Sequence, residues 1–358
     1  MNTKQYIDQS SAWLPDDTGG GIAISSRVRL ARNLKDQSFP SWAGDDACLN
    51  IWQQLSAVLP ECEVLADAQV VSMEDISALD KQVLFERHLI SREQAERKSG
   101  AGVIIRGDES VAVMVNEEDH IRLQSLRPGL ALRKAWETAD ALDSQMEEIL
   151  DFAFSAQLGH LTACPSNVGT GMRASVMLHT PGLVLMDEMN AVIKGMAKIG
   201  LAVRGLWGEG SESAGNMFQV SNQITLGERE EDIIQTLDQI VLEIIEHEKN
   251  ARWRVFEQNE QRVHDQVGRA YGVLSNAHIL NSKEALDLLS YLRLGVDMGI
   301  VKLKDEAVIN ELLIATQPGH LQKMQGKRLK AHERDVARAA LVRSKLQKSP
   351  KRANRKKS

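Results

Sequence analysis

CPSNVGTGMRASV, residues 164–176, is the segment from which the fold of this chain can best be inferred. Its centre, PSNVGTG, combines glycine with small polar residues and predicts a loop. LGHLTAC (158–164) precedes the loop and is expected to be a strand, and Arg173 follows directly after it. Cys164 stands where the two meet. A lone cysteine more often packs as a small apolar side chain than reacts, so both interpretations stay open at this point.

Further segments place charged or small residues beside predicted strands. They are SSRVR (25–29), NEEDHIR (116–122), RGLWGEGSES (204–213) and RDVARA (334–339). The period of two in an extended chain puts Arg27 and Arg29 on one face. NEEDHIR gathers three carboxylates and an arginine, and RGLWGEGSES sets Arg204 and Glu209 among glycines. Taken alone, each segment has a plain structural explanation, since a pair such as Arg27 and Arg29 is usually a solvated strand face and the others could be charged or glycine-containing turns.

Together these segments have the composition of a phosphoryl-transfer site. Such catalysis depends mainly on positioning and on stabilising the charge of the phosphoryl oxygens. Arginine suits this task because its planar, permanently charged fork binds phosphate through two hydrogen bonds. The chain contains neither a GxxxxGK[ST] loop nor the HRD and DFG motifs of common protein kinases. A nucleotide would therefore have to be held by arginines.

In chain order, SSRVRLARN, NEEDHIR, CPSNVGTGMRASV and RGLWGE resemble the signature segments of the guanidino (phosphagen) kinases. Within that family they are most similar to those of the bacterial protein-arginine kinases. The resemblance runs from about residue 25 to residue 222, and RDVARA extends it toward the C-terminus. It implies an α+β fold, with a catalytic domain of antiparallel sheet flanked by helices and a helical C-terminal domain.

The resemblance also implies a nucleotide site for ATP with Mg²⁺. Five arginines would bind the phosphates, His88 would stack near the base, and three short stretches would face the nucleotide. The residues with these implied roles are Ser25, Ser26, Arg27, Val28, Arg29, His88, Arg122, Arg173, Ala174, Ser175, Val176, Met177, Arg204, Gly205, Leu206, Trp207, Gly208 and Glu209. Magnesium is expected to bridge the phosphates rather than to occupy a site built from protein ligands.

Catalytic roles follow from the same resemblance. Glu118 and Glu209 correspond to the carboxylates that clamp the substrate guanidinium, and Cys164 corresponds to the reactive cysteine beside it. The chemistry agrees, because an arginine guanidinium, whose pKa lies far above neutral pH, is a poor nucleophile. Two carboxylates can aim one of its nitrogens at the γ-phosphorus and accept the proton that it loses.

The helical C-terminal region carries a second implied site. On a helix, Arg334 and Arg338 share a face and Asp335 lies beside them. Such a triplet is more often a surface ion-pair stripe. The resemblance reverses this preference, because RDxxRA marks an allosteric phospho-arginine-binding site in the protein-arginine kinases. Two guanidinium groups would hold the phosphoryl group, and the carboxylate would hold the guanidinium of the ligand.

The expected domains are a catalytic domain over 1–255, a helical domain over 256–345 and a basic, disordered tail over 346–358. The catalytic domain is expected to contain helices over 44–59, 73–99 and 129–151, and a hairpin formed by 102–107 and 111–116. From about residue 228 the apolar residues recur at threes and fours over many turns, which predicts helix. Gln317-Pro318-Gly319 is expected to end one of these helices.

Small-molecule phosphagen kinases carry a helical domain before the SSRVR-type segment, which begins here at Ser25. The expected activity is therefore transfer of the ATP γ-phosphoryl group to arginine side chains of proteins. One alternative is a kinase of free arginine or of another small guanidino compound. A second alternative is a non-catalytic adaptor that binds phospho-arginine. The resemblance implies as partners an activating zinc-binding adaptor and the Clp ATPase and protease, and it implies a homodimer, allosteric control and a part in the stress response.

Composition limits the environment of the protein. No run approaches the roughly 18 apolar residues that a membrane span needs, and the first ten residues are polar, so a cytoplasmic protein is expected. Cys48, Cys62 and Cys164 are too widely spaced for a zinc site or disulfide framework. Residues 331–358 hold 10 basic and 2 acidic side chains, which leaves 33 and 47 for residues 1–330, a net charge of −14 there. This acidic body disfavours nucleic acid, except at the basic tail.

Overall fold

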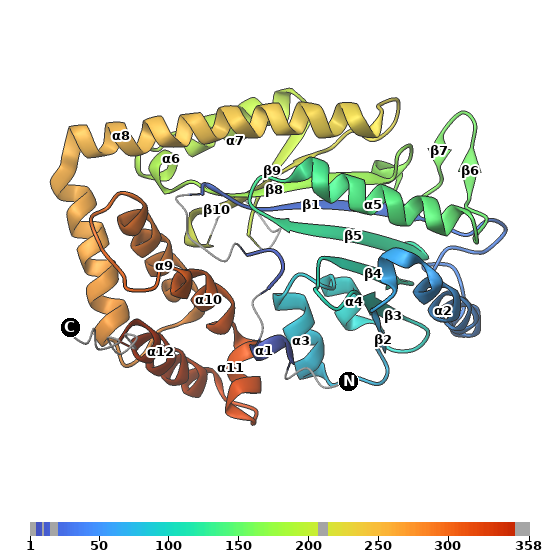
Figure 1. Ribbon diagram of the computed structural model, residues 1–358, viewed down its shortest axis with the longest axis horizontal. Helices are drawn as coiled ribbons and strands as arrows, with labels where there is room; N and C mark the ends of the chain where they lie inside the picture. The colour runs from blue at the N-terminus through green and yellow to red at the C-terminus, as the bar shows by residue number, and fades with distance from the viewer. Residues whose placement is uncertain (1–4, 9–10, 15–20, 207–213, 348–358) are drawn as a thin grey trace, which may run out of the picture.

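The computed structural model describes residues 5–8, 11–14, 21–206 and 214–347. Within these ranges the chain forms an eight-stranded antiparallel sheet with helices on both faces (Figure 1). The order of neighbouring strands is β2 (Gln69–Ser72), β3 (Gly102–Ile105), β4 (Val111–Val115), β5 (Ile121–Pro128), β1 (Ala23–Arg32), β8 (Met172–His179), β10 (Met217–Asn222) and β9 (Leu201–Gly205). The predicted α+β class with an antiparallel sheet is confirmed.

Strand β1 lies at the centre of the sheet, between β5 and β8. Val28 and Leu30 are fully buried in the main hydrophobic core, whereas Arg27 and Arg29 retain some exposure. Because successive side chains of a strand point to opposite faces, the sheet separates an apolar face from a face that carries the arginines. The predicted sharing of one face by Arg27 and Arg29 is thereby confirmed.

The apolar face is covered by three helices, α2 (Asp45–Val58), α5 (Leu132–Glu147) and α8 (Glu230–Asn276). Figure 1 shows α5 and α8 running along the sheet. Their apolar residues recur at helical spacing, and those that face the sheet are buried, as Leu142 and Leu237 are. The helices predicted over 44–59 and 129–151 correspond to α2 and α5, and the predicted hairpin corresponds to β3 and β4.

The arginine-bearing face is covered only at its two ends. At one end α3 (Ala78–Glu86) and α4 (Arg92–Glu96) pack on β3 and β4. At the other end the C-terminal helices pack on β1, β5, β8 and β10 through residues such as Met177 and Ile309. These helices are α9 (Ser282–Asp297), α10 (Ala307–Ala315) and α12 (Ala331–Gln347), and α11 (Pro318–Gln325) contacts α3. The predicted helical C-terminal region is confirmed.

Helix α8 joins the two parts of the chain. Its backbone leaves helical geometry at Asn259 (φ −156°, ψ 67°), just after the expected domain limit at 255. Before this kink the helix packs on the sheet, and after it Val263 and Val267 pack beside Met298 and Val301 at the end of α9. The expected tail begins within α12, whose last residue is Gln347, and residues 348–358 lie outside the described ranges.

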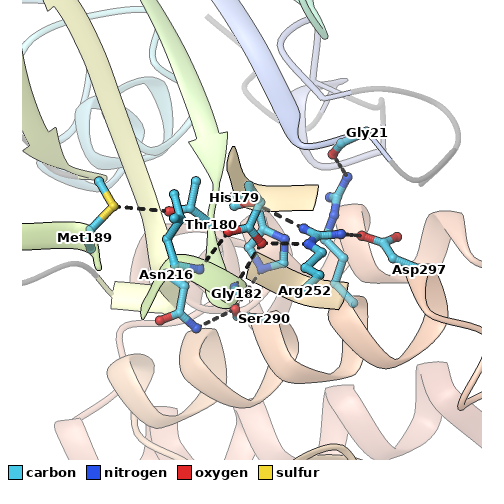
Figure 2. Close-up of polar contacts among 12 residues, drawn as sticks. Gly21, His179, Thr180, Gly182, Met189, Asn216, Arg252, Ser290 and Asp297 are labelled. Carbon is cyan, nitrogen blue, oxygen red and sulfur yellow. Dashed lines mark hydrogen bonds and ion pairs between the residues drawn. The ribbon is translucent and has the colours of Figure 1, made fainter. Parts of the chain in front are cut away.

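Buried polar contacts join β8 to α8 and α9 (Figure 2). His179 at the end of β8 and Asn216 before β10 both contact the hydroxyl of Ser290 on α9, at 2.8 Å each. Arg252 on α8 donates to Asp297 on α9 at 3.0 Å and to the carbonyl of His179 at 3.3 Å. Buried polar groups need such partners, so the junction fixes how the C-terminal helices meet the sheet.

Two predicted elements were wrong. The helix expected over 73–99 is divided into α3 and α4, because His88 adopts a left-handed backbone (φ 58°) and the Ser91 hydroxyl caps α4 by accepting from the Gln94 amide at 3.0 Å. Of the strand expected over 158–164, only β7 (Gly159–His160) forms, paired with β6 (Phe154–Ser155). Beyond β7, Asn33 donates to the Leu161 carbonyl and Asp119 accepts from the Ala163 amide, so side chains replace a strand partner.

Candidate active site

A cavity of about 580 Å³ opens on the arginine-bearing face of the sheet, beside α3 and α4. This volume is typical of a site for a small molecule or nucleotide. Of the residues predicted from the sequence, the cavity brings together Arg27, Arg29, His88, Glu118, Arg122, Arg173, Arg204 and Leu206. These residues come from positions far apart in the chain, and the order of strands β5, β1, β8, β10 and β9 places them side by side.

The sheet register sets the spacing of the arginines. Arg29 on β1 lies directly opposite Arg173 on β8, and Arg27 lies opposite Ser175. Arg122 comes from the adjoining strand β5. Because these side chains share one face, their guanidinium groups surround a common space rather than pointing into solvent separately.

The arginines repel one another in the absence of an anion. Burial, and then the charges of Arg122 and Arg173, lower the pKa of Arg27 to about 10. Burial and the charges of its neighbours lower the pKa of Arg29 even further below the ordinary value. Arg27 stays protonated at neutral pH, and an arginine guanidinium in general keeps its charge in proteins. A polyanion such as the triphosphate of ATP would relieve this repulsion, which makes the cavity selective for highly charged anions.

One arginine is paired. Arg122 donates to the carboxylate of Glu117 at 2.5 Å, and the Ser91 hydroxyl and the Glu118 amide donate to the same carboxylate at 2.5 and 3.0 Å. Burial raises the pKa of Glu117, but the charge of Arg122 and these hydrogen bonds outweigh it and lower the pKa overall. Glu117 is therefore ionised, and it fixes the position of Arg122.

Glu118 lies beside this pair with its side chain exposed. Its pKa is raised, first by partial burial and then by the charges of Asp119 and Glu117. A carboxylate with a raised pKa is a better proton acceptor than an ordinary one. The two adjacent glutamates thus differ in environment, since Glu117 is buried and paired whereas Glu118 remains accessible to a substrate.

Asp119 connects Glu118 to the segment that carries Cys164. Its buried carboxylate accepts from Asn33 at 2.6 Å and from the Ala163 amide at 2.7 Å. The bond to Ala163 holds the segment of Glu118 in a fixed position relative to the segment of Cys164. The thiol of Cys164 is half-buried and lies 3.0 Å from the Ser166 hydroxyl.

Cys164 is expected to react with iodoacetamide faster than Cys48 and Cys62. The latter two are buried, and burial raises the pKa of both thiols, which lowers their reactive thiolate fraction. Brief labelling followed by peptide mapping measures the three rates, with unfolded protein as the control in which they converge. Saturating nucleotide plus an arginine substrate is expected to slow the labelling of Cys164. Equal rates in the folded protein would contradict this expectation.

His88 forms one wall of the cavity. Its ring meets the Trp13 ring edge-on, with centroids 4.7 Å apart and an interplanar angle of 76°. Burial, followed by the charges of Arg27 and Arg29, lowers the pKa of His88 to about 3. The ring is therefore neutral at physiological pH, and it offers an aromatic surface beside the arginines instead of another positive charge.

The other predicted nucleotide residues divide by strand alternation. Val28, Ala174 and Val176 point into the core on the far face, so their side chains do not line the cavity. The Ser26 hydroxyl bonds to the Gly129 carbonyl and the Ala131 amide. Ser25, Ser175 and Met177 line a small hollow next to the cavity, together with Trp13 and His88. Gly205 ends β9. Trp207, Gly208 and Glu209 lie outside the described residues.

Sequence reasoning missed several residues of the cavity wall. Gln219 on β10 accepts from Arg27 at 2.9 Å, and no motif identifies it. Arg97 donates to the carbonyl of Glu117, and Arg92 and Glu93 in the first turn of α4 complete this side of the cavity. The break between α3 and α4 exposes these residues to the cavity, and the continuous helix expected there concealed them.

The RDVARA motif lies on α12 as predicted, but its residues are not equivalent. Arg338 is fully buried and donates to the Thr316 carbonyl at 2.8 Å, to the Leu280 carbonyl at 2.7 Å, to the Ser282 hydroxyl at 2.8 Å and to Asp335 at 2.6 Å. Its guanidinium is thus largely occupied by the fold itself. Arg334 and Asp335 are partly accessible. The phospho-arginine-binding role of Arg334, Asp335 and Arg338 stays a prediction.

Two family models match the chain. Residues 50–251 match ATP:guanido phosphotransferase, C-terminal catalytic domain, and residues 260–357 match the protein-arginine kinase McsB C-terminal domain. Within the described residues no helix is both long and apolar enough to span a membrane.

Related proteins agree with these matches. Protein-arginine kinase from Moorella thermoacetica is 45% identical over 347 residues, covering 95% of this chain and 98% of that one. The Bacillus subtilis protein-arginine kinase is 44% identical over 350 residues, covering 97% and 96%. Among solved structures, a duplicated taurocyamine kinase from Schistosoma mansoni (TM-score 0.58, 24% identity, 75% of this chain and 40% of that chain) and lombricine kinase (TM-score 0.55, 20% identity, 68% and 72%) share the fold. The chain therefore belongs to the ATP:guanido phosphotransferase family, among the protein-arginine kinases.

Proposed function

We propose that this protein transfers the γ-phosphoryl group of ATP to the guanidinium groups of arginine residues in proteins. The observation that carries the proposal is the meeting of Arg27, Arg29, Arg122 and Arg173 with Glu118 in one cavity. The arginines supply the positive charge that a triphosphate requires, and Glu118 supplies the negative charge that a guanidinium requires. The names of its full-length relatives agree with this activity.

The chemistry follows from the two halves of the cavity. The arginines hold the phosphates and stabilise the charge on the equatorial oxygens of the transferred group. Glu118 orients the substrate guanidinium and accepts the proton that leaves the attacking nitrogen. Glu209, which lies outside the described residues, takes the second carboxylate role by family resemblance. Cys164 adds orientation and charge and forms no covalent intermediate.

Magnesium fits this site only as a partner of the nucleotide. The described residues contain no cluster of three or more His, Cys, Asp or Glu side chains able to hold a metal, and the cavity wall is dominated by arginine. Mg²⁺ bound to the phosphates would neutralise part of their charge. The protein's own contribution is to position the phosphates through Arg27, Arg29, Arg122, Arg173 and Arg204.

A protein substrate is favoured over free arginine by the exposure of Glu118 in the cavity wall. The first alternative, a kinase of free arginine, predicts that the free amino acid is phosphorylated at least as well as a protein. A non-catalytic adaptor would bind phospho-arginine without turnover. The expected acidic body suits substrates whose exposed arginines make them locally basic.

Further proposals rest on the family resemblance. They are the domain limits 1–255, 256–345 and 346–358, a homodimer, an activating zinc-binding adaptor, delivery of tagged proteins to a Clp ATPase and protease, a stress-response role, and a cytoplasmic location. An allosteric phospho-arginine site at Arg334, Asp335 and Arg338 belongs with these. In this structure Arg338 also donates to the carbonyls of Thr316 and Leu280.

Mass spectrometry tests the proposed activity. The protein, a generic unfolded protein substrate and Mg-ATP are incubated together, and peptides are kept out of acid because P–N bonds are acid-labile. Arginine residues carrying a phosphoryl group are the expected product. Phosphorylation of added free arginine alone would favour the small-molecule alternative. Binding of phospho-arginine without any ATP-dependent product would favour the adaptor.

A further inference from the structure

Three consecutive residues at the end of α3 face three different parts of the molecule. Glu86 contacts α11 of the C-terminal region, Arg87 contacts the turn between β3 and β4, and His88 lines the cavity. His88 has a left-handed backbone, which turns the chain sharply after Arg87. The position of His88 therefore depends on how its two predecessors are held.

Glu86 holds α11 through a complete set of hydrogen bonds. Its carboxylate, which is 2% exposed, accepts from the Gly319 amide at 2.7 Å, from the His320 amide at 3.0 Å and from His320 Nδ1 at 2.7 Å. Gln82, one turn earlier on α3, donates to it at 2.9 Å. A buried carboxylate is stable only with such partners, so α3 and α11 are bound to each other at this point.

The contact is built for close approach. A β-carbon at Gly319 would lie 2.8 Å from a Glu86 carboxylate oxygen and 2.9 Å from the side chain of Gln82. At the edge of the same interface, Lys323 on α11 pairs with Asp80 on α3 at 2.6 Å. The sequence Gln317-Pro318-Gly319, which was expected only to stop a helix, follows the end of α10 and begins α11.

On its other side α11 is fastened to the rest of the helical region. Arg338 of α12 donates to the Thr316 carbonyl, directly before the start of α11, and the Leu329 amide donates to Gln322 at 3.0 Å. The corner after Glu86 is equally fixed. Arg87 forms a buried two-bond pair with Glu109 at 2.6 and 2.8 Å, and the His88 carbonyl accepts from Gln124 at 2.6 Å.

We propose that Glu86 is a positioning residue for nucleotide binding. Through it, α11 sets the place of Phe85 and His88 in the cavity wall, so the C-terminal helical region is a working part of the nucleotide site. The inference rests on the proposed function, since it takes the cavity to be the ATP site. Its physical basis is that groups forming a binding site must be held by supporting contacts to within fractions of an ångström.

Two variants disturb the contact in different ways. Glu86→Gln keeps the shape of the side chain but turns an amide donor toward the donors of Gly319 and His320. Gly319→Ala removes no hydrogen-bonding group and improves helix propensity, yet its β-carbon would have to displace the Glu86 carboxylate, the Gln82 side chain or α11 itself. Gly268→Ala on α8 is the control, because nothing lies within 4 Å of its added β-carbon.

The dissociation constant of a fluorescent ADP analogue is measured for each protein, together with KM for ATP, KM for a protein substrate and kcat. For Glu86→Gln and Gly319→Ala we expect nucleotide affinity to fall about tenfold, a typical coupling between linked sites, with KM for ATP rising in parallel. The KM for protein substrate and kcat at saturating ATP should stay near the wild-type values, as should every parameter of Gly268→Ala.

The outcomes test the proposed function and the positioning role of Glu86 separately. If wild-type protein binds no nucleotide, the proposed function fails. If wild type binds nucleotide and both variants bind it equally well, the positioning role of Glu86 is wrong. Equal losses in kcat and in both KM values would indicate general damage and would also overturn it. Should Glu86→Gln not fold, Gly319→Ala decides alone, because it keeps every polar group of the contact.

Discussion

Replacing Glu118 with glutamine is expected to lower kcat by about 10²- to 10⁴-fold, the usual contribution of a positioned proton acceptor. Nucleotide affinity is expected to stay near the wild-type value. Glu118 lies with the arginines in the cavity, but it is the neighbouring Glu117 that pairs with Arg122. Glutamine retains the size of the side chain and loses the charge that holds the guanidinium. Initial rates of arginine phosphorylation and the binding of an ADP analogue measure the two quantities.

The pH dependence gives the same prediction a second readout. The carboxylate of Glu118 acts in its ionised form, so activity is lost as pH falls through its pKa. Because burial and the charges of Asp119 and Glu117 raise that pKa above 4.5, the acidic limb of the rate profile is expected above this value. Glu118→Gln should remove the limb from the residual activity.

Glu93→Gln is the matched control for this prediction. Glu93 is an exposed carboxylate in the same cavity wall. It differs from Glu118 in its position in the sequence, because Glu118 directly follows the Glu117 that pairs with Arg122. Glu93→Gln should therefore change kcat little, and removal of its charge should lower the pKa of Glu118 slightly. Near-normal turnover of Glu118→Gln would show that another group holds the guanidinium.

The sequence predicted those cavity residues that strand alternation or a family motif identifies. Alternation along SSRVR correctly placed Arg27 and Arg29 on one face, because successive side chains of an extended strand point to opposite faces of the sheet. The family motifs supplied Glu118, Arg122, Arg173 and Arg204, all of which line the cavity. Arg122, Arg173 and Arg204 belong to separate strands, and Glu118 lies between β4 and β5. Local pattern alone does not specify which strands become neighbours.

What local pattern could not show depends on contacts between distant segments. The bond between Arg27 and Gln219 spans 192 residues of sequence, and that between Glu86 and Gly319 spans 233. The continuous helix expected over 73–99 was wrong because apolar spacing alone does not register a left-handed residue at His88 or a cap at Ser91.

Replacing Arg29 with methionine is expected to stabilise the nucleotide-free protein and to abolish most of its stabilisation by nucleotide. The Nε atom of Arg29 is buried and has no hydrogen-bond partner among the described residues. Arg27, Arg122 and Arg173 repel its charge, and Glu117 offsets this repulsion in part. Removing a buried, poorly paired polar group of this kind is worth about 1–3 kcal/mol in the free energy of unfolding.

The effect should not depend on pH near neutrality. A base whose folded pKa is lowered destabilises the folded state at every pH below that folded value, and stability returns only as pH rises from the folded toward the unfolded pKa. For Arg27, whose pKa is lowered to about 10, that window lies above pH 10. At physiological pH both states are protonated, so the repulsion among the arginines is fully present and only an anion or a substitution relieves it.

Thermal unfolding with and without Mg-ADP, in buffer free of phosphate and sulfate, measures both effects. Arg29→Met should raise Tm in the absence of nucleotide and weaken nucleotide binding by about 10- to 100-fold, which corresponds to one or two charge-assisted hydrogen bonds. Arg269→Met, which removes an exposed arginine paired only with Asp265 one turn away on α8, should change neither quantity. A lower Tm for Arg29→Met, with the nucleotide-induced rise intact, would mean that Arg29 supports the fold and not the phosphates. A higher Tm for Arg29→Met, with the nucleotide-induced rise lost, would show that the cluster of like charges on this strand lowers the stability of the nucleotide-free protein. Nucleotide binding then restores that stability, because a ligand that binds the folded state stabilises it.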